Sequence, residues 1–329
     1  MQRADSHRNY KGNSGVDFSL KGDSRVMQEC GRSYATIELD IENIKYNEPM
    51  KNHTSFKVGG PADILIEPDN VEELVLAIKK LRKGNIPYYI IGNGTNLLVS
   101  DKGIRGAVVK IGEKFGRIDI SGDRIISESG VLLSTLSKIA AKNSLTGMEF
   151  ASGIPGALGG AATMNAGAYG GEMKDIVEWV EVLDRNLKLK RLTNGEMNFG
   201  YRKSVVEPNK YIVVRACIKL EKGNPDEIYG IMAELTERRK NKQPLHLPSA
   251  GSTFKRPEGY FAGKLIEDAG LKGYSVGGAQ VSTLHSGFVV NNGDATAQDV
   301  YQLIRNVQKT VLEKFGVKLE TEVKILGEF

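Results

Sequence analysis

The residues with the clearest chemical potential are the seven glycines of FASGIPGALGGAATMNAGAYGG, between Phe150 and Gly171. Each interior glycine costs a helix about 0.5–1 kcal/mol relative to alanine, so the run predicts a poor helix. Its backbone N–H groups, with no Cβ atoms in the way, can approach a large flat or anionic ligand. Tight turns between packed elements would also use glycine. The length of this uncharged run, with Asn165 inside it, favours a cofactor-binding bed.

A second glycine-rich loop follows a short predicted strand at residues 88–91. The sequence Gly92-Asn93-Gly94-Thr95-Asn96 places several backbone N–H groups in one concavity, which suits a pyrophosphate. No Gly-Lys-Ser/Thr follows, so this is not a P-loop, and Leu97 stands where the dinucleotide-binding fingerprint needs its third glycine. A plain hairpin turn fits the loop equally well. Together with the run at 150–171, it predicts a dinucleotide cofactor bound outside a Rossmann frame.

Short strands and helices must position these two loops. A helix capped by Asp69 and closed by Gly84 follows the first strand. The elements do not alternate steadily between strand and helix, which predicts an α+β fold. The predicted strands cover 62–66, 88–91, 107–111, 117–120, 124–127, 176–184, 188–192, 211–220 and 319–327, and the later helices cover 132–143, about 225–242, 261–268 and 297–315.

Bulk composition indicates a soluble globular protein of two or three domains, with 329 residues of which 40% are hydrophobic and 26% charged. No apolar run approaches the roughly 20 residues of a membrane span, and no signal peptide is evident. Two cysteines and four histidines predict neither a disulfide framework nor a metal site, which suits a reducing cytoplasm. The net charge of +5 is spread along the chain and predicts no nucleic-acid partner.

Three segments are expected. Residues 1–43 are a disordered or expression-derived extension, because they show no apolar period. Residues 44–222 form a first domain with subdomains at about 44–112 and 113–222, and residues 223–329 form a second domain. The boundary is placed where Gly223-Asn224-Pro225 opens a helix.

Seven motifs in register, covering about residues 44–327, resemble the UDP-N-acetylenolpyruvoylglucosamine reductase family. The match is to its shorter form, without the extra tyrosine-bearing loop. The resemblance implies a two-subdomain FAD-binding unit of the vanillyl-alcohol-oxidase (PCMH) type and a C-terminal α+β substrate domain. The motifs are NHTSFKVGGPAD, GNGTNLLVSDKGIRG, FASGIPGALGGAATMNAGAYGGE, YRKS, QPLHLPSAGSTFKRP, GGAQVSTLHSGFVVN and ETEVKILG.

The implied reaction is the NADPH-dependent, FAD-mediated reduction of UDP-N-acetylglucosamine enolpyruvate to UDP-N-acetylmuramate, for peptidoglycan. Hydride addition to C3 pushes charge onto the substrate carboxylate, which calls for a cation or acid. By motif, Arg202 and Glu322 polarise that carboxylate, and Ser252 gives the proton to C2. On residue type alone, Arg202 would be a structural ion-pair partner. Glu322 would be an exposed strand residue, and Ser252 a turn residue.

The resemblance also implies binding residues, and no metal. The FAD diphosphate is expected at the 92–97 loop and the flavin along the glycine run. FAD is expected to be non-covalent, since His53 and Cys217 lie in no covalent-attachment motif. The implied FAD-binding residues are Gly92, Asn93, Gly94, Thr95, Asn96, Leu97, Gly153, Ile154, Pro155, Gly156, Gly159, Gly160, Asn165, Ala166, Gly167 and Arg238, and the substrate-binding residues are Tyr201, Lys240, Arg256, Gln280 and His285.

Two other functions fit the glycine loops. One is an FAD oxidase of the same fold that acts on an alcohol or sugar with O₂. The other is a nucleotide-binding regulatory or scaffold protein without turnover. The motifs that hold Arg202, Ser252 and Glu322 argue against both. The expected partners are NADPH and a UDP-sugar, with no membrane contact, and the protein is expected to be a cytoplasmic monomer.

Overall fold

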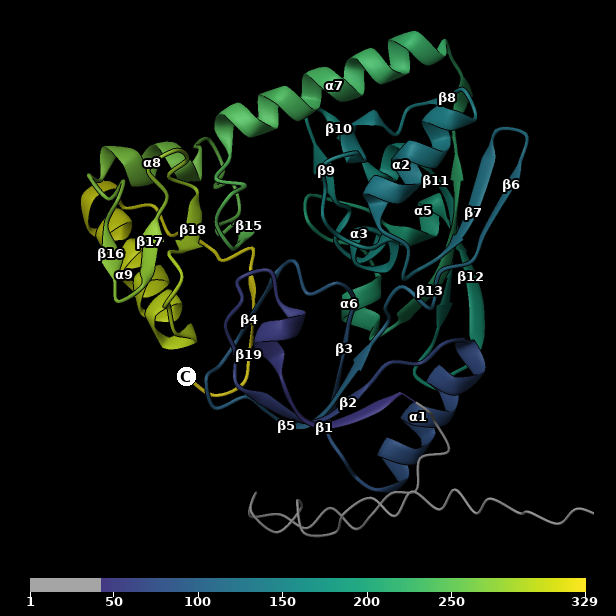
Figure 1. The fold of residues 1–329 in the computed structure, drawn as a ribbon, viewed down its shortest axis with the longest axis horizontal. Helices are drawn as coiled ribbons and strands as arrows, with labels where there is room; N and C mark the ends of the chain where they lie inside the picture. Colours follow the sequence, from purple (N-terminus) through teal and green to yellow (C-terminus); the bar gives the residue numbers. More distant parts are fainter. Residues whose placement is uncertain (1–42) are drawn as a thin grey trace, which may run out of the picture. The chain divides into compact units, whose positions relative to one another are not determined.

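The first sheet carries the 92–97 loop at one end of a strand (Figure 1). Its strands, in spatial order, are β1 (Ile44–Pro49), β2 (Pro61–Ile66), β5 (Ile104–Lys110) and β3 (Tyr88–Ile91). β1 is antiparallel to β2, whereas β2, β5 and β3 are parallel. The carboxyl ends of the parallel strands therefore meet at one edge, where α/β sheets commonly bind ligands.

The helix α1 (Val71–Lys83) begins one residue later than the sequence predicted. Its N-cap is Asn70, whose side chain accepts a hydrogen bond from the backbone N–H of Glu73. The predicted cap, Asp69, is wrong: its carboxylate accepts from the Asn43 side chain instead. The computed structural model describes residues 43–329, so the expectation for residues 1–42 lies outside the described residues.

A second, antiparallel sheet follows, with strands β6 (Ile118–Ser121), β7 (Arg124–Glu128), β11 (Val177–Leu183), β12 (Leu189–Thr193) and β13 (Ile212–Lys219) in the order β12-β11-β13-β7-β6. The core on this sheet includes Leu136 of α2 (Leu133–Lys142), Val180 of β11 and Ala216 of β13. The shorter elements around it are β8 (Leu145–Thr146), η2 (Glu149–Ala151), β9 (Gly167–Ala168), β10 (Gly171–Glu172), α4 (Met173–Ile176), α5 (Asn194–Met197), α6 (Val206–Asn209) and β14 (Glu221–Lys222).

The prediction of a poor helix in the glycine run was wrong for its centre, which forms α3 (Leu158–Met164). Burial of Leu158, Ala161 and Ala162 in the core stabilises this helix despite two glycines. Gly159 is required for packing, because a Cβ there would lie 2.9 Å from the Cβ of Ser129. The helix ends at Asn165, whose φ of 47° is left-handed.

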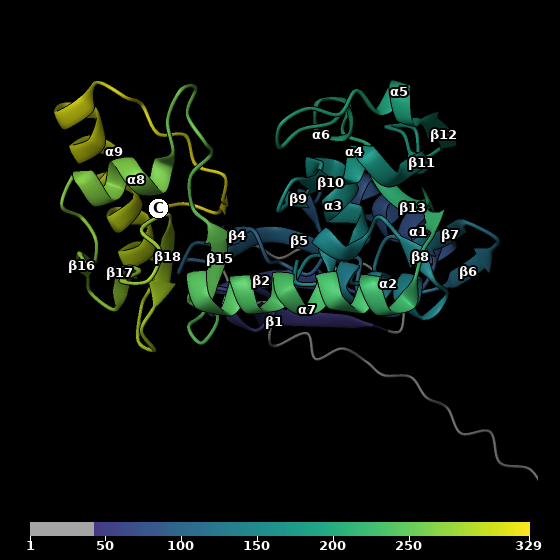
Figure 2. The same ribbon diagram turned by 90° about the horizontal axis from the view of Figure 1, so that it is seen from above.

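The C-terminal part has a four-stranded sheet of order β15-β18-β17-β16, with strands β15 (Ser249–Ser252), β16 (Ser275–Val276), β17 (Ala279–Val281) and β18 (Phe288–Asn291). The helix α9 (Ala297–Phe315) buries the predicted apolar stripe, including Val300, Leu303 and Val307. α8 (Ala262–Asp268) contacts α9. The long helix α7 (Pro225–Lys242) runs beside α2 and is mostly exposed (Figures 1 and 2).

The last strand returns to the first half of the chain. β19 (Lys324–Leu326) pairs in parallel with β4 (Leu97–Val99), directly after the 92–96 loop. The sequence predicted a longer strand at 319–327 and no strand at 97–99. The domain boundary expected near Gly223 stays a prediction, and this strand pairing crosses it. Within residues 43–329, no helix is both long and apolar enough to cross a membrane.

Candidate active site

A cavity of about 360 Å³ brings together residues that lie far apart in the sequence. It lies between the 201–202 turn, the β15 end, the α8 start, the 284–287 loop and the segment before β19. Six of the predicted site residues line it: Tyr201, Arg202, Ser252, Arg256, His285 and Glu322. No group of three or more His, Cys, Asp or Glu residues suited to a metal ion occurs in the described part of the chain.

Arg202 and Glu322 form an ion pair in this cavity. Arg202 Nε donates to Glu322 Oε1 at 2.8 Å, and Arg202 Nη2 donates to the carbonyl of Gly167 at 3.3 Å. The pair therefore joins the wall of the cavity to the glycine run. The Glu322 side chain is only 11% exposed. Burial raises the pKa of its carboxyl above the usual value, although the charge and hydrogen bond of Arg202 act against that rise.

Ser252 is the last residue of β15, and its backbone segment lies next to that of Glu322. The next residue, Thr253, accepts a hydrogen bond at its carbonyl from the N–H of Glu322, at 2.9 Å. Ser252 is exposed within the cavity lining, and its hydroxyl has no hydrogen-bond partner among residues 43–329. A strand end thus presents a free hydroxyl close to the Arg202–Glu322 pair.

His285 contributes a neutral imidazole to the same cavity. The backbone N–H of Gly287 donates to His285 Nδ1 at 3.0 Å, so the proton of the neutral ring is on Nε2. Burial lowers the pKa of His285, which keeps the ring neutral. The neighbouring Ser286 was not predicted; its buried hydroxyl lacks a partner in the described structure, and its residue also lines the cavity.

Aromatic rings and a guanidinium form the outer wall. The backbone N–H of Arg256 donates to the Tyr201 hydroxyl at 3.0 Å. The Arg256 guanidinium lies 4.1 Å from the ring centre of Phe261, and its Nε donates to the carbonyl of Tyr260. Phe261 is 62% exposed and was missed from the sequence, because a single aromatic residue before a helix carries no binding signal.

Two predicted substrate residues lie outside this cavity lining. Gln280 Nε2 donates to the Gly273 carbonyl and to Ser275 Oγ, at 3.2 and 3.0 Å. These bonds hold the β16–β17 pair together. Lys240 lies on the exposed surface of α7 and pairs with Glu237 at 2.9 Å.

The two glycine loops adjoin each other and the cavity. Asn93 Nδ2 donates to the Pro155 carbonyl at 2.9 Å, which ties the 92–97 loop to the glycine run. Asn96 Nδ2 donates to the Glu322 carbonyl at 3.0 Å. Asn165 is fully buried and donates to the Gly200 carbonyl at 3.1 Å, close to Arg202. Among the remaining predicted FAD residues, Gly92, Thr95, Leu97, Ile154, Gly156, Gly160 and Ala166 belong to these same loops and their flanks.

The geometry of Gly94 shows why the loop needs glycine. Its φ is +66°, which side-chain-bearing residues rarely adopt, and a Cβ would lie 1.8 Å from the His53 carbonyl oxygen. At Gly160, by contrast, a Cβ would meet no atom within 4 Å outside its own stretch of α3. The 92–96 loop is thus tightly packed at Gly94, whereas the glycine run has open space at Gly160.

At the end of α7, both Arg238 and Arg239 approach the glycine run, and Arg239 rather than Arg238 bonds to its backbone. An Arg239 guanidinium N–H donates to the Gly153 carbonyl. Arg238 pairs with Glu234 and lies 5.0 Å from the ring centre of Tyr169. Both arginines approach that ring, and Tyr169 was also missed from the sequence.

A second cavity, of about 280 Å³, lies at the carboxyl edge of the first sheet, on the Asn93 side of the loops. The sequence did not identify it, because its residues come from five separate segments of the chain. They include Glu67, Asn93, Lys110, Gly130 and Leu132.

Comparisons with known proteins identify the family of this chain. Residues 62–193 match the FAD binding domain family, and residues 243–326 match the C-terminal domain of UDP-N-acetylenolpyruvoylglucosamine reductase. The reductase of that name from Caldanaerobacter subterraneus subsp. tengcongensis is 60% identical over 282 residues, which cover 86% of this chain and 93% of the relative. The chain belongs to the UDP-N-acetylenolpyruvoylglucosamine reductase family.

Further relatives of this reductase family support the assignment. The enzyme from Alkaliphilus oremlandii is 58% identical, with 86% of this chain and 93% of the relative covered. The crystal structure of the reductase from Thermus caldophilus is 39% identical, has a TM-score of 0.74 and covers 87% of this chain and 98% of that chain. The resemblance and the predicted fold class are confirmed, and the reductase is favoured over the oxidase.

The ionisation of Glu322 gives a first prediction. A carboxyl whose pKa is raised by folding contributes stability below its unfolded pKa and loses that contribution as pH rises through the folded pKa. From about pH 4 upward, we therefore expect the free energy of unfolding of the wild type to fall relative to that of Glu322→Gln. Urea denaturation of both proteins at a series of pH values measures this difference in the free energy of unfolding. Glu320→Gln, at an exposed neighbouring glutamate, is the control. If the difference in the free energy of unfolding between the wild type and Glu322→Gln stays constant with pH, the pKa of Glu322 is not raised.

The contacts of α7 give a second prediction. Arg239→Gln should raise the dissociation constant for FAD about tenfold, because it removes a charged hydrogen bond to the glycine run. Lys240→Gln should leave that constant unchanged, since Lys240 pairs only with an exposed glutamate. Fluorescence titration of the deflavinated variants with FAD distinguishes the two. Equal losses in both would mean that the basic helix end acts only through its net charge.

Proposed function

We propose that this protein reduces UDP-N-acetylglucosamine enolpyruvate to UDP-N-acetylmuramate with NADPH and FAD, in the synthesis of peptidoglycan precursors. The proposal rests on one observation: Arg202, Glu322 and Ser252 line one cavity beside two glycine loops. The names of the relatives specify the substrate of those enzymes.

The glycine loops fit FAD. The 92–96 loop offers backbone N–H groups for the diphosphate, and the run from Gly153 to Gly167 offers a surface without large side chains. Arg239 adds a cation at the edge of that run. Bound FAD would supply hydride transfer from NADPH to C3 of the enolpyruvyl group. The cavity beside Asn93 is our candidate for the adenosine half.

Arg202 and Glu322 would act on the substrate carboxylate. Negative charge moves onto this group when C3 receives hydride, and a fixed guanidinium lowers the energy of that state. Arg202 is held in place by Glu322 and Gly167, so little reorganisation is needed. Glu322 fixes the position of that guanidinium, and burial raises the pKa of its carboxyl above the usual value.

Ser252 would give the proton to C2. A serine hydroxyl is a weak acid, so it serves only where the acceptor is strongly basic and nearby cations stabilise the alkoxide. The carbanion-like C2 formed after hydride addition is such an acceptor. Arg202 and Arg256 line the same cavity and supply positive charge.

The outer wall would hold the rest of the sugar nucleotide. The Arg256 guanidinium and the Nε2–H of His285 can donate hydrogen bonds to a diphosphate, and the Tyr201 and Phe261 rings can contact a ribose or base. We further propose that residues 44–222 bind FAD while residues 223–329 bind substrate, and that the protein is a cytoplasmic monomer.

An anaerobic visible absorbance spectrum tests this function. NADPH should bleach a flavin band, and UDP-N-acetylglucosamine enolpyruvate should restore it. A band that bleaches but returns only with air would indicate the oxidase. No band after addition of FAD would mean that the glycine loops bind something else. A band that NADPH leaves unchanged would fit a binding protein without turnover.

A further inference from the structure

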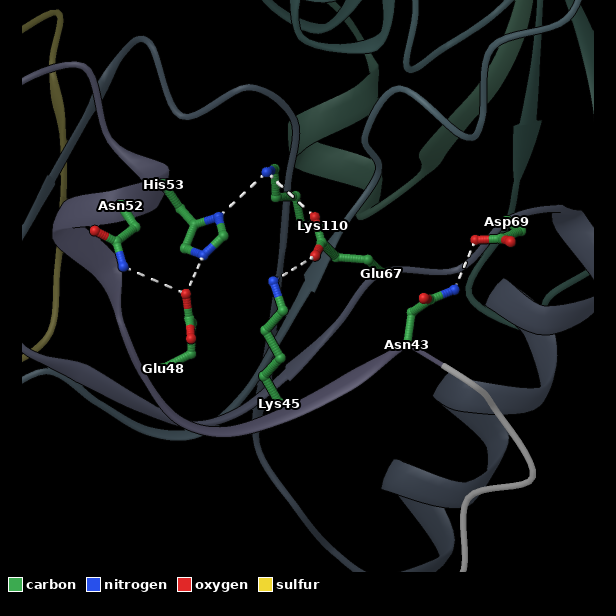
Figure 3. A network of polar contacts seen from close by, with 8 residues as sticks. All are labelled: Asn43, Lys45, Glu48, Asn52, His53, Glu67, Asp69 and Lys110. Atoms are coloured by element: carbon green, nitrogen blue, oxygen red, sulfur yellow. Dashed lines mark hydrogen bonds and ion pairs between the residues drawn. The ribbon is translucent and has the colours of Figure 1, made fainter. Parts of the chain in front are cut away.

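Figure 3 shows a network of polar contacts that joins Glu48, His53, Lys110, Glu67 and Lys45. His53 Nε2 lies 2.8 Å from Glu48 Oε1, and His53 Nδ1 lies 3.2 Å from Lys110 Nζ. Lys110 also pairs with Glu67 at 3.2 Å, and Glu67 pairs with Lys45 at 3.3 Å. These contacts thus link β1, the 3-10 helix η1 (Met50–His53), β5 and the end of β2.

The contacts of His53 define one tautomer. A lysine ammonium only donates hydrogen bonds, so Nδ1 of His53 must accept from Lys110. The Nε2–H then donates to the Glu48 carboxylate. A second proton, on Nδ1, would point at the Lys110 ammonium and remove this hydrogen bond. The neutral ring is therefore the form that joins Glu48 to Lys110.

This network of contacts reaches the 92–96 loop at two points. The His53 carbonyl oxygen lies where a Cβ of Gly94 would be, and the N–H of Ser55 donates to the Gly94 carbonyl at 3.2 Å. Lys110 is paired in the sheet with Ile91, the residue before Gly92. The side chain of His53 is only 7% exposed, so its ring is enclosed between these two supports.

We propose that neutral His53, bridging Glu48 and Lys110, is a positioning residue that holds the Gly92–Asn96 loop in the shape that binds the FAD diphosphate. His53 itself does not touch the cofactor in this account; it acts through the backbone of η1 and through Lys110. The inference rests on the proposed use of FAD. Burial alone would raise the pKa of Glu48, but hydrogen bonds from His53 and Asn52 bring it below the usual value, so the partner of Nε2–H is ionised.

Titration of deflavinated protein with FAD tests the proposal. His53→Leu should raise the FAD dissociation constant about tenfold, as expected for lost hydrogen bonds to charged groups. His53→Gln, which keeps one donor and one acceptor, should stay within about threefold of wild type. His246→Gln, at an exposed histidine, should bind FAD as tightly as wild type.

Several outcomes would overturn the proposal. One is wild-type affinity in His53→Leu, and another is an affinity of His53→Gln as low as that of His53→Leu. If His53→Leu does not fold, a loss of tenfold or more in folded His53→Gln would overturn the proposal by itself. Wild-type protein that binds no FAD would instead refute the proposed function.

Discussion

Replacing Ser252 by alanine should leave flavin reduction by NADPH nearly intact and slow the second half-reaction about 100-fold or more. That factor is the usual scale for loss of a general acid. Ser252 lies at the end of β15 with an unpartnered hydroxyl, so its removal breaks no hydrogen bond within residues 43–329. The Arg202–Glu322 pair, which would polarise the substrate carboxylate, is retained.

Anaerobic stopped-flow absorbance separates the two half-reactions of Ser252→Ala. Ser249→Ala is the matched control, because Ser249 begins the same strand but does not line the cavity. Solvent deuterium should slow the second half-reaction of the wild type but have less effect on the variant. If both half-reactions proceed at wild-type rates, Ser252 is not the proton donor. If both slow equally, its role is in binding or structure.

Gly94→Ala should largely abolish FAD binding, raising the dissociation constant about 100-fold or more. The new Cβ would overlap the His53 carbonyl oxygen, 1.8 Å away, so the backbone must move. The left-handed φ adds about 1–2 kcal/mol for a side-chain-bearing residue. A displaced loop misaligns several N–H groups at once, and each hydrogen bond to a charged acceptor contributes about 1.5–3 kcal/mol.

The flavin content of purified Gly94→Ala and its titration with FAD measure this loss. Gly230→Ala is the control: Gly230 lies within α7, no atom would be within 4 Å of its Cβ, and alanine favours a helix. Thermal unfolding of both apoproteins shows whether the fold of Gly94→Ala persists. A Gly94→Ala protein that purifies with a full complement of FAD would contradict a role for this loop in cofactor binding.

Local patterns were sufficient to predict most of the longer elements. The apolar stripe of α9 is buried as a helical period predicts, except for the exposed Leu312. In β2, burial alternates only as far as Ile64, because Leu65 and Ile66 are both buried. The helix α3 was missed because its stability comes from packing of small residues on the second sheet, which propensity does not include. β4 was missed because its partner, β19, lies more than 200 residues away in the sequence.

The motifs singled out Arg202, Ser252 and Glu322, and the structure places these three residues in one cavity. Single positions on a helix were harder to choose. Consecutive helical residues point about 100° apart, so the choice between Arg238 and Arg239 depends on how α7 lies on the glycine run. The contacts of His53 follow no sequence motif at all, since they join four separate elements.

The pairing of β19 with β4 also affects how the protein is made. Residues 43–222 leave the ribosome long before β19, and folding generally starts with the segments that emerge first. The nascent chain must hold the 92–97 loop without Glu322 and Lys324, whose backbone groups bind Asn96 in the finished protein. Flavin loading is therefore expected after translation of β19, which would keep partly made chains from carrying a redox-active cofactor.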